Sequence, residues 1–306
     1  MFELLGITPQ ALTAQLLVGL INGSFYAILS LGLAIIFGLL NIINFAHGAQ
    51  YTMGAFIAWI GLTKISQWLG FPDLSMNYWF ALIVVPLLMG GFGLILERTM
   101  LQRLYKLDHL YGLLLTFGLA LIIEGMFRHW YGISGESYPA PELFQGAIPL
   151  ESIGIILPKY RVWVVIISLT ACFSTWYAIE KTKLGAYLRA GTENPKLLQA
   201  FGINVPLMIS LAYAYGVGLA GFAGVLAAPI FQVNPLMGSN LIIVVFAVVV
   251  IGGMGSIMGA IITGLSLGLI EGLTKVFYPE AAGVIIFVIM AIVLLIRPAG
   301  LFGRER

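Results

Sequence analysis

The chain has 306 residues, of which 60% are hydrophobic and only 9% are charged. Ordinary soluble domains carry about 25% charged residues, and a soluble fold of this length could not cover its surface with so few. A lipid exterior makes an apolar surface favourable, so the composition predicts an integral membrane protein. The net charge of +2 supplies no basic field, and no nucleic-acid partner is expected.

Nine apolar runs are candidate membrane-spanning helices, because a helix needs about 20 residues to cross the hydrocarbon core. They lie near residues 12–38, 47–66, 79–98, 110–131, 162–180, 207–228, 239–253, 257–276 and 282–298. The seventh run is short, and the first is long with Asn22-Gly23-Ser24 near its middle, so eight or ten helices are alternatives. The expected fold is all-α and polytopic, with about nine transmembrane helices and with broken or re-entrant segments.

The distribution of Lys and Arg in the short connections predicts the orientation. If the chain crosses at every run, one side holds ten of these residues and the other side holds five. The richer side contains Arg98, Arg103, Lys106, Lys181, Lys183, Arg189, Lys196, Arg297, Arg304 and Arg306. The poorer side contains Lys64, Arg128, Lys159, Arg161 and Lys275. This bias favours a cytoplasmic C-terminus and, with nine helices, an external N-terminus.

Two connections are long enough to have functions of their own. Residues 132–160 form a predicted outward-facing (periplasmic) loop with four prolines and three glutamates, and residues 181–206 form a predicted cytoplasmic loop. The phosphate-binding pattern G-x-x-x-x-G-K-[ST] occurs nowhere in the chain. The chain is therefore not expected to be an ATPase.

The segment at 41–51 places polar side chains inside an apolar stretch. An amide or imidazole that faced lipid without a partner would cost several kcal/mol. These groups must therefore face protein, a water-filled path or the headgroup zone, and a substrate pathway and an ordinary interfacial turn both remain open. The candidate pathway residues are Asn41, Asn44, His47, Gly48, Gln50 and Tyr51.

A second segment, at 251–260, has four glycines within eight residues between two short apolar runs. Transporters place such breaks where unwound backbone lines a cavity, although an ordinary turn would have the same composition. The candidate pathway residues here are Gly252, Gly253, Gly255 and Ser256.

Few ionisable residues lie within the predicted helices. Glu271 and Lys275 have the spacing and order of an intrahelical ion pair. Glu124 and Arg128 lie near an outer helix end, where they can also pair locally or reach the headgroups. No buried acidic relay of the kind that drives proton-coupled carriers is recognisable, which counts against that class.

The cytoplasmic loop contains the signals of a short helix. Asn194 is a good N-cap, Pro195 suits the first helical position, and Gly202 is a suitable stop. These signals predict a helix of about seven residues, roughly 10 Å long. Such a helix could dock into a groove on another protein and act as a lever, or it could lie on the headgroups as an amphipathic turn.

Five short motifs of the chain resemble those of the permease subunits of branched-chain amino acid ABC importers, the LivH-type family. The motifs are I-N-F-A-H-G-A at 43–49, R-A-G-T-E-N-P at 189–195, F-G-I-N-V at 201–205, G-G-M-G-S-I-M-G-A at 252–260 and R-P-A-G-L-F-G at 297–303. They span nearly the whole chain in the order found in the family. The resemblance implies a single permease domain over residues 1–306.

The resemblance also implies a complex in the bacterial inner membrane. This complex would contain two permease subunits (this chain and a related, different partner), two ATP-binding cassette ATPase subunits and a periplasmic substrate-binding protein. ATP and Mg would bind to the ATPase subunits, and this chain would bind no cofactor and no metal. Residues 190–202 would correspond to the coupling helix. The ATPase-coupling residues would be Arg189, Glu193, Asn194, Pro195 and Gly202.

Several alternatives remain open at this point. Related systems carry urea, amides or other small carboxylates, so the substrate is not fixed. A pair of identical permeases is an alternative to a pair of different ones. A self-sufficient carrier or channel is a second class of function. A membrane-embedded enzyme is a third, but the three histidines form no metal-ligand motif and no nucleophile–base set is apparent.

Overall fold

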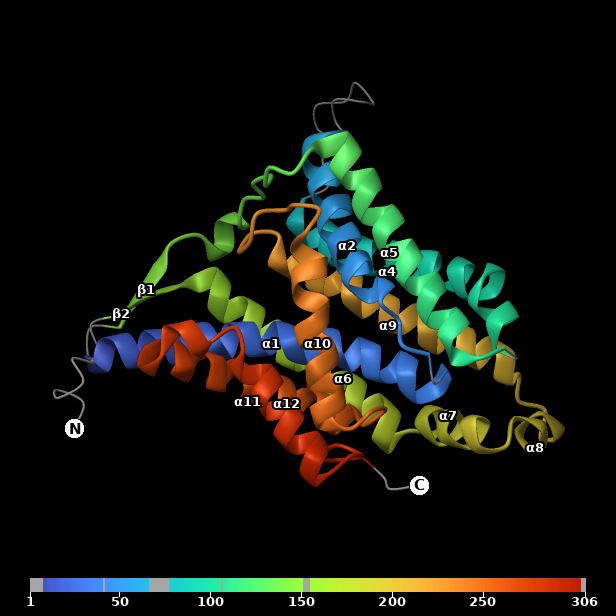
Figure 1. The fold of residues 1–306 in the computed structure, drawn as a ribbon. Coiled ribbons are helices and arrows are strands. Elements are labelled where there is room, and N and C mark those ends of the chain that lie inside the picture. The colour runs from blue at the N-terminus through green and yellow to red at the C-terminus, as the bar shows by residue number, and fades with distance from the viewer. Residues whose placement is uncertain (1–7, 41, 66–76, 106, 151–154, 304–306) are drawn as a thin grey trace. The chain divides into compact units, whose positions relative to one another are not determined.

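The computed structural model describes residues 8–40, 42–65, 77–105, 107–150 and 155–303. Its long helices are α1 (Pro9–Leu40), α2 (Ala46–Thr63), α4 (Tyr78–Thr99), α5 (His109–Tyr131), α6 (Lys159–Lys181), α9 (Val205–Ala227), α10 (Met237–Gly252), α11 (Ile257–Phe277) and α12 (Ile285–Ile296) (Figure 1). The shorter elements are η2 (Leu101–Leu104), η3 (Glu142–Phe144), α7 (Lys183–Glu193), α8 (Pro195–Ala200), η4 (Pro279–Ala281) and the strands β1 (Ala147–Leu150) and β2 (Ile155–Pro158).

Each of the nine predicted runs coincides with a helix among the described residues. In the part of the chain that the structure describes, six helical segments are long and apolar enough to cross a membrane: α1, α4 with η2, α5, α6, α9 and α11. The helices α10 and α12 are apolar but shorter, with 16 and 12 residues. The protein is therefore a mainly helical, multi-pass membrane protein, and nine crossings remain a prediction.

The outward-facing loop predicted at 132–160 contains the only strands of the described chain. The strands β1 and β2 pair antiparallel, with Ala147 opposite Pro158 and Pro149 opposite Ile156. The prolines at these positions suit a two-stranded ribbon, in which each strand has an edge without a neighbour. The all-α prediction thus omitted this small hairpin, because its residues alternate too briefly to indicate strands.

The chain forms two compact units. One contains the described residues of Met1–Ser30, Ala140–Cys172 and Val244–Arg306, and the other those of Leu31–Pro139 and Phe173–Ile243. This division does not test the prediction of a single permease domain over residues 1–306, which remains a prediction.

Within the first unit, α1 packs on α11 at glycines. A Cβ atom built on Gly19 would lie 2.5 Å from the carbonyl oxygen of Gly268. Near this contact Glu271 accepts hydrogen bonds from the Tyr26 hydroxyl at 2.6 Å and from Lys275 at 2.5 Å. The predicted pair of Glu271 with Lys275 is confirmed, and it satisfies a carboxylate that would be costly in lipid.

The second unit is built around α9, against which α2 and α4 pack (Figure 1). Glycines let the α2 and α9 backbones touch, because a Cβ built on Gly54 would lie 2.6 Å from the Gly221 Cα. Small residues at helix crossings permit this approach in lipid, where association depends on packing rather than on the hydrophobic effect. The position of α9 therefore depends on the absence of side chains at this crossing.

Replacing Gly54 by Ala should destabilise the protein, because the new methyl group would meet backbone that has no room to move. Overpacking of this kind costs about 1–3 kcal/mol in unfolding free energy. The matched control is Gly91→Ala on α4, where a Cβ meets nothing within 4 Å. Thermal unfolding in detergent should show a lower midpoint for Gly54→Ala only. Equal midpoints for the two variants would contradict the close crossing.

Candidate pathway and coupling loop

Asn44, immediately before α2, is the centre of a buried polar cluster. Its Nδ2 donates to the Oε1 of Gln50 at 3.2 Å and lies 3.3 Å from the Tyr213 hydroxyl, which accepts from it. Asn44 is 1% exposed, and Gln50 is fully buried. The structure thus brings together two predicted pathway residues with Tyr213 of α9. The sequence offered no signal for Tyr213, because it stands in an uninterrupted apolar helix.

The other described pathway residues of this segment, His47, Gly48 and Tyr51, are also buried inside the second unit. His47 lies beside α1, because a Cβ built on Gly32 would be 3.1 Å from its Cε1. Gly48 lies against α10, where its added Cβ would be 2.6 Å from the Gly238 oxygen. These residues therefore lie inside the protein, and a substrate pathway beside them remains a prediction. Asn41 lies outside the described residues.

Not every group of this cluster is satisfied. The Oδ1 atom of Asn44 is buried and has no hydrogen-bond partner in the described part of the chain. Most buried polar atoms in proteins have a partner, and an orphaned one costs about 1–3 kcal/mol. A buried acceptor beside a transport path can accept a hydrogen bond from water or from a passing solute.

One helical turn from Tyr213, α9 contacts a buried carboxylate that the sequence analysis missed. Glu97 of α4 is 1% exposed, and it accepts hydrogen bonds from Tyr105 and from Ser210, both at 2.5 Å. No ion pair joins Glu97 to a basic residue among the described residues. The sequence analysis missed Glu97 because its neighbour Arg98 made this helix end resemble an ordinary end at the membrane–water interface. Burial, together with the bond and charge of Glu97, raises the pKa of Tyr105, so its hydroxyl stays protonated and donates.

The second predicted pathway segment forms the turn between α10 and α11. Gly253 and Gly255 have φ angles of 97° and 85°, a region that favours glycine. Ser256 caps α11 by accepting from the Gly259 amide at 3.1 Å. The amide of Leu301 donates to Ile251 at 2.8 Å. Gly252, Gly253, Gly255 and Ser256 thus belong to a tight connection to which the 297–303 motif is bonded.

The loop at 181–206, which was predicted to be cytoplasmic, contains two helices instead of the single one predicted. The predicted helix is α8, with six residues, a cap formed by Asn194 on the Leu197 amide at 3.0 Å, and Pro195 in its first turn. It ends before Gly202, whose φ of 81° suits a helix stop. The preceding α7 has 11 residues and was not predicted, because Gly185 and Gly191 weaken its helical pattern.

These two helices rest on the start of α9. A Cβ built on Gly191 would lie 2.7 Å from the Met208 Cε and 3.5 Å from both Leu198 and Val205. Arg189 donates to the Ile179 carbonyl at 3.2 Å and lies 3.6 Å from Glu180, so it ties α7 to the end of α6. Displacement of α7 and α8 would therefore act directly on α9.

The face of α8 turned away from α9 exposes apolar side chains. Leu197 is 56% exposed and Phe201 is 75% exposed, whereas Leu198 is buried. Glu193, Asn194 and Pro195 are exposed beside them. Exposed large apolar side chains at the centre of a polar loop are typical of docking surfaces. The sequence analysis predicted α8 but did not identify Leu197 and Phe201 as candidate docking residues.

The described residues contain no group of three or more His, Cys, Asp or Glu that could hold a metal ion. The site therefore consists of a buried polar cluster, a buried carboxylate and a two-helix loop. Together with the membrane-spanning helices, this arrangement fits the class of membrane transport subunits.

The family described as "Branched-chain amino acid transport system / permease component" matches residues 15–294. The chain belongs to this family, and it is the permease component of an importer. No solved structure matches.

Among curated relatives, the chain is 30% identical to the high-affinity branched-chain amino acid transport system permease protein BraD of Pseudomonas aeruginosa, over 95% of each chain. It is 26% identical to the corresponding protein LivH of Escherichia coli K12, also over 95% of each chain. A probable LivH of Methanocaldococcus jannaschii is 28% identical, over 94% of this chain and 91% of that one.

Replacing Glu97 by Ala should destabilise the protein strongly, because two buried hydroxyls lose their acceptor. Hydrogen bonds to charged groups contribute about 1.5–3 kcal/mol each. Glu97→Gln keeps an acceptor and should lose less, and Glu142→Ala, at an exposed position, should lose nothing measurable. The thermal unfolding midpoint in detergent should be lowest for Glu97→Ala, higher for Glu97→Gln and unchanged for Glu142→Ala. A midpoint for Glu97→Ala equal to that of Glu142→Ala would contradict the buried network.

Proposed function

We propose that this chain is one of two permease subunits in an ATP-driven importer of branched-chain or related amino acids in the bacterial inner membrane. The relatives named above carry branched-chain amino acids according to their names. The observation that carries the ATP-driven assignment is the loop of α7 and α8, which exposes Leu197 and Phe201 next to its contact with α9. The chain has no phosphate-binding motif, so ATP and Mg would bind to the two ATPase subunits.

The coupling step begins at α8. Phe201 and Leu197 enter a groove on an ATPase subunit, and Arg189, Glu193, Asn194, Pro195 and Gly202 hold the loop in shape and contact its rim. Closure of the ATPase dimer moves this surface. Gly191 packs against the Met208 side chain, so the displacement reaches α9 through this contact.

The transport step depends on two residues of α9, Ser210 and Tyr213. Ser210 bonds to Glu97, and Tyr213, one turn further on, bonds to Asn44. A shift of α9 must break or re-form these bonds together, so the cluster near α2 has two discrete arrangements. Alternating access of the path beside Asn44, Gln50 and Tyr51 is the expected result. A periplasmic binding protein would supply the substrate at the outer end, near residues 132–160.

One observation favours the alternative of a self-sufficient carrier. Glu97 is a buried carboxylate within a membrane-spanning helix, and such groups serve as proton relays in carriers. However, Glu97 bonds to Tyr105, which follows η2, and to Ser210 of α9. These bonds are typical of a structural link between helices. The two classes are separated by reconstitution, as follows.

Proteoliposomes that contain the permeases without the ATPase subunits should take up no leucine under a proton or sodium gradient. Adding the ATPase subunits, the binding protein and ATP should restore uptake, because the energy enters through α8. The control is the same complex with a non-hydrolysable ATP analogue. Uptake driven by a gradient alone would overturn the importer assignment and support the carrier.

The double variant Leu197→Ser/Phe201→Ser should lose ATPase subunits on co-purification and lose uptake, because its apolar anchors are removed. The matched control is Ile133→Ser/Leu143→Ser, which removes equally exposed apolar side chains from the opposite loop. Arg189→Ala and Glu193→Lys should reduce ATPase stimulation by substrate more than they reduce assembly. ATPase binding and uptake at the wild-type level in all these variants would remove α8 from the coupling role.

A further inference from the structure

An apolar groove of about 500 Å³ lies beside the contact between α7 and α9 in the second unit. Its walls come from the end of α6, from α7 and from the first half of α9, and Ile35 of α1 also lines it. Leu184 and Leu211 line the groove and are 64% and 54% exposed, so it is open at the protein surface. Ligand sites commonly have volumes of about 300–1,000 Å³, so the groove is large enough to hold a ligand.

Three polar side chains that line the groove are engaged within the protein. The hydroxyls of Thr175 and Tyr215 share a hydrogen bond of 2.6 Å. Asn204 accepts from the Leu207 amide at 3.1 Å and so caps α9. A polar solute would lose its hydration on entering and gain few hydrogen bonds, whereas a hydrocarbon chain loses nothing of this kind. The groove therefore favours an apolar occupant.

A cation stands at the edge of this groove. The Arg189 Nη1 donates to the carbonyl oxygen of Ile179, a lining residue, at 3.2 Å. It also lies 3.6 Å from Glu180, and the Arg189 side chain is 46% exposed. A guanidinium has five N–H donors, so these two contacts leave donors for a ligand. Lys183, which is exposed, directly precedes the lining residue Leu184.

The segment around α7 carries the excess positive charge of the whole chain. Residues 180–196 contain four basic and two acidic residues, whereas the rest of the sequence has equal numbers of both. The basic residues are Lys181, Lys183, Arg189 and Lys196, and the acidic ones are Glu180 and Glu193. Basic clusters next to membrane-spanning helices attract anionic lipid headgroups. The groove thus combines an apolar interior with a cationic edge.

We propose that this groove binds one anionic phospholipid. One acyl chain lies against Leu184, Leu207 and Leu211, and the phosphate accepts hydrogen bonds from Arg189 and Lys183. Guanidinium groups bind phosphate through two parallel hydrogen bonds, which suits Arg189 to this role. The bound lipid contacts α6, α7 and α9 together and stabilises their packing. This site goes beyond the proposed function, because it does not depend on the solute that is transported.

A helix of another protein fits the groove less well than an acyl chain does. An α-helix is about 10 Å across, so the groove has about the volume of a single helical turn. An acyl chain is thinner and flexible, and it can follow a groove of this size. The walls include α6 and α9, which are both long and apolar enough to cross a membrane. Lipid therefore lies next to the groove without any further partner.

Native mass spectrometry of the delipidated full-length chain in detergent tests the proposal. The dissociation constant of a single bound lipid is measured for phosphatidylglycerol and for phosphatidylcholine with the same acyl chains. Phosphatidylglycerol should bind about fivefold more tightly, because only its headgroup carries a net negative charge. Glycerol phosphate at the same concentration should not displace it, because it has no acyl chain. Equal binding of the two lipids, or displacement by glycerol phosphate, would overturn the site.

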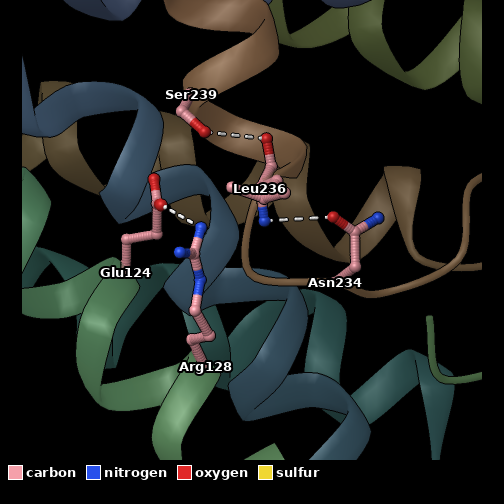
Figure 2. A network of polar contacts seen from close by, with 5 residues as sticks. All are labelled: Glu124, Arg128, Asn234, Leu236 and Ser239. Atoms are coloured by element: carbon pink, nitrogen blue, oxygen red, sulfur yellow. Dashed lines mark hydrogen bonds and ion pairs between the residues drawn. The ribbon is translucent and has the colours of Figure 1, made fainter. Parts of the chain in front are cut away.

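Removing the cations should abolish the preference for the anionic headgroup. Lys183→Gln/Arg189→Gln should bind phosphatidylglycerol only as well as phosphatidylcholine. The matched control is Arg128→Gln/Lys159→Gln, which removes two exposed charges from elsewhere. Arg128 resembles Arg189 in being half exposed and paired, because its Nη2 lies 2.9 Å from the Glu124 Oε1 (Figure 2). This contact also confirms the local pair predicted on α5. A preference lost equally in both double variants would contradict a specific site.

Filling the groove should remove the lipid without changing any charge. Ala178→Phe places a ring among the lining residues and should weaken phosphatidylglycerol binding about fivefold or more. The matched control is Ser174→Phe, at an exposed position of α6 that does not line the groove, and it should bind as the parent does. Unchanged binding in a folded Ala178→Phe variant would overturn the site. If this variant does not fold, the headgroup preference of the parent and its loss in Lys183→Gln/Arg189→Gln decide the question.

Discussion

The second unit depends on the close approach of helix backbones at glycine. Gly54 and Gly221 let α2 and α9 touch, and Gly48 does the same for α2 and α10. Because no side chains separate these helices, the polar groups beside the crossings have short and fixed partners. Asn44 therefore reaches Tyr213 on a neighbouring helix. Without the glycines, the same side chains would be separated and left unsatisfied in an apolar surrounding.

Within the second unit, one helix contacts both the loop of α7 and α8 and the buried polar groups. The start of α9 packs against α7 and α8, and its next two turns carry Ser210 and Tyr213, which bond to Glu97 of α4 and to Asn44 before α2. The loop at 181–206 is thus connected to Asn44 through a continuous helix, although the two are far apart in the sequence. The proposed coupling role depends on this connection.

Much of the fold could be predicted from composition and run length. Every predicted apolar run became a helix, because lipid leaves the backbone few alternatives. The cap at Asn194 was predictable as well, because a capping side chain acts within its own turn. The small hairpin and α7 were not, because short strands and glycine-containing helices depend on their neighbours for stability.

The candidate site was predictable only where polarity interrupts an apolar run. Asn44 and Gln50 stood out for that reason, whereas Tyr213, Ser210 and Glu97 did not. A tyrosine or serine in a helix is ordinary, and a glutamate next to an arginine indicates an interface. Their role arises from tertiary contacts between residues more than 100 positions apart, such as Ser210 and Glu97. Pattern within one segment contains no information about such pairs.

The turn between α10 and α11 is completed by residues made much later. Leu301 donates to Ile251 and Phe302 donates to Gly252. The carbonyls at the end of α10 therefore lack these donors until residues 297–303 have emerged from the ribosome and the insertion machinery. The connection between α10 and α11 can therefore take its final hydrogen-bonded form only after α12 and the residues that follow it have been synthesised.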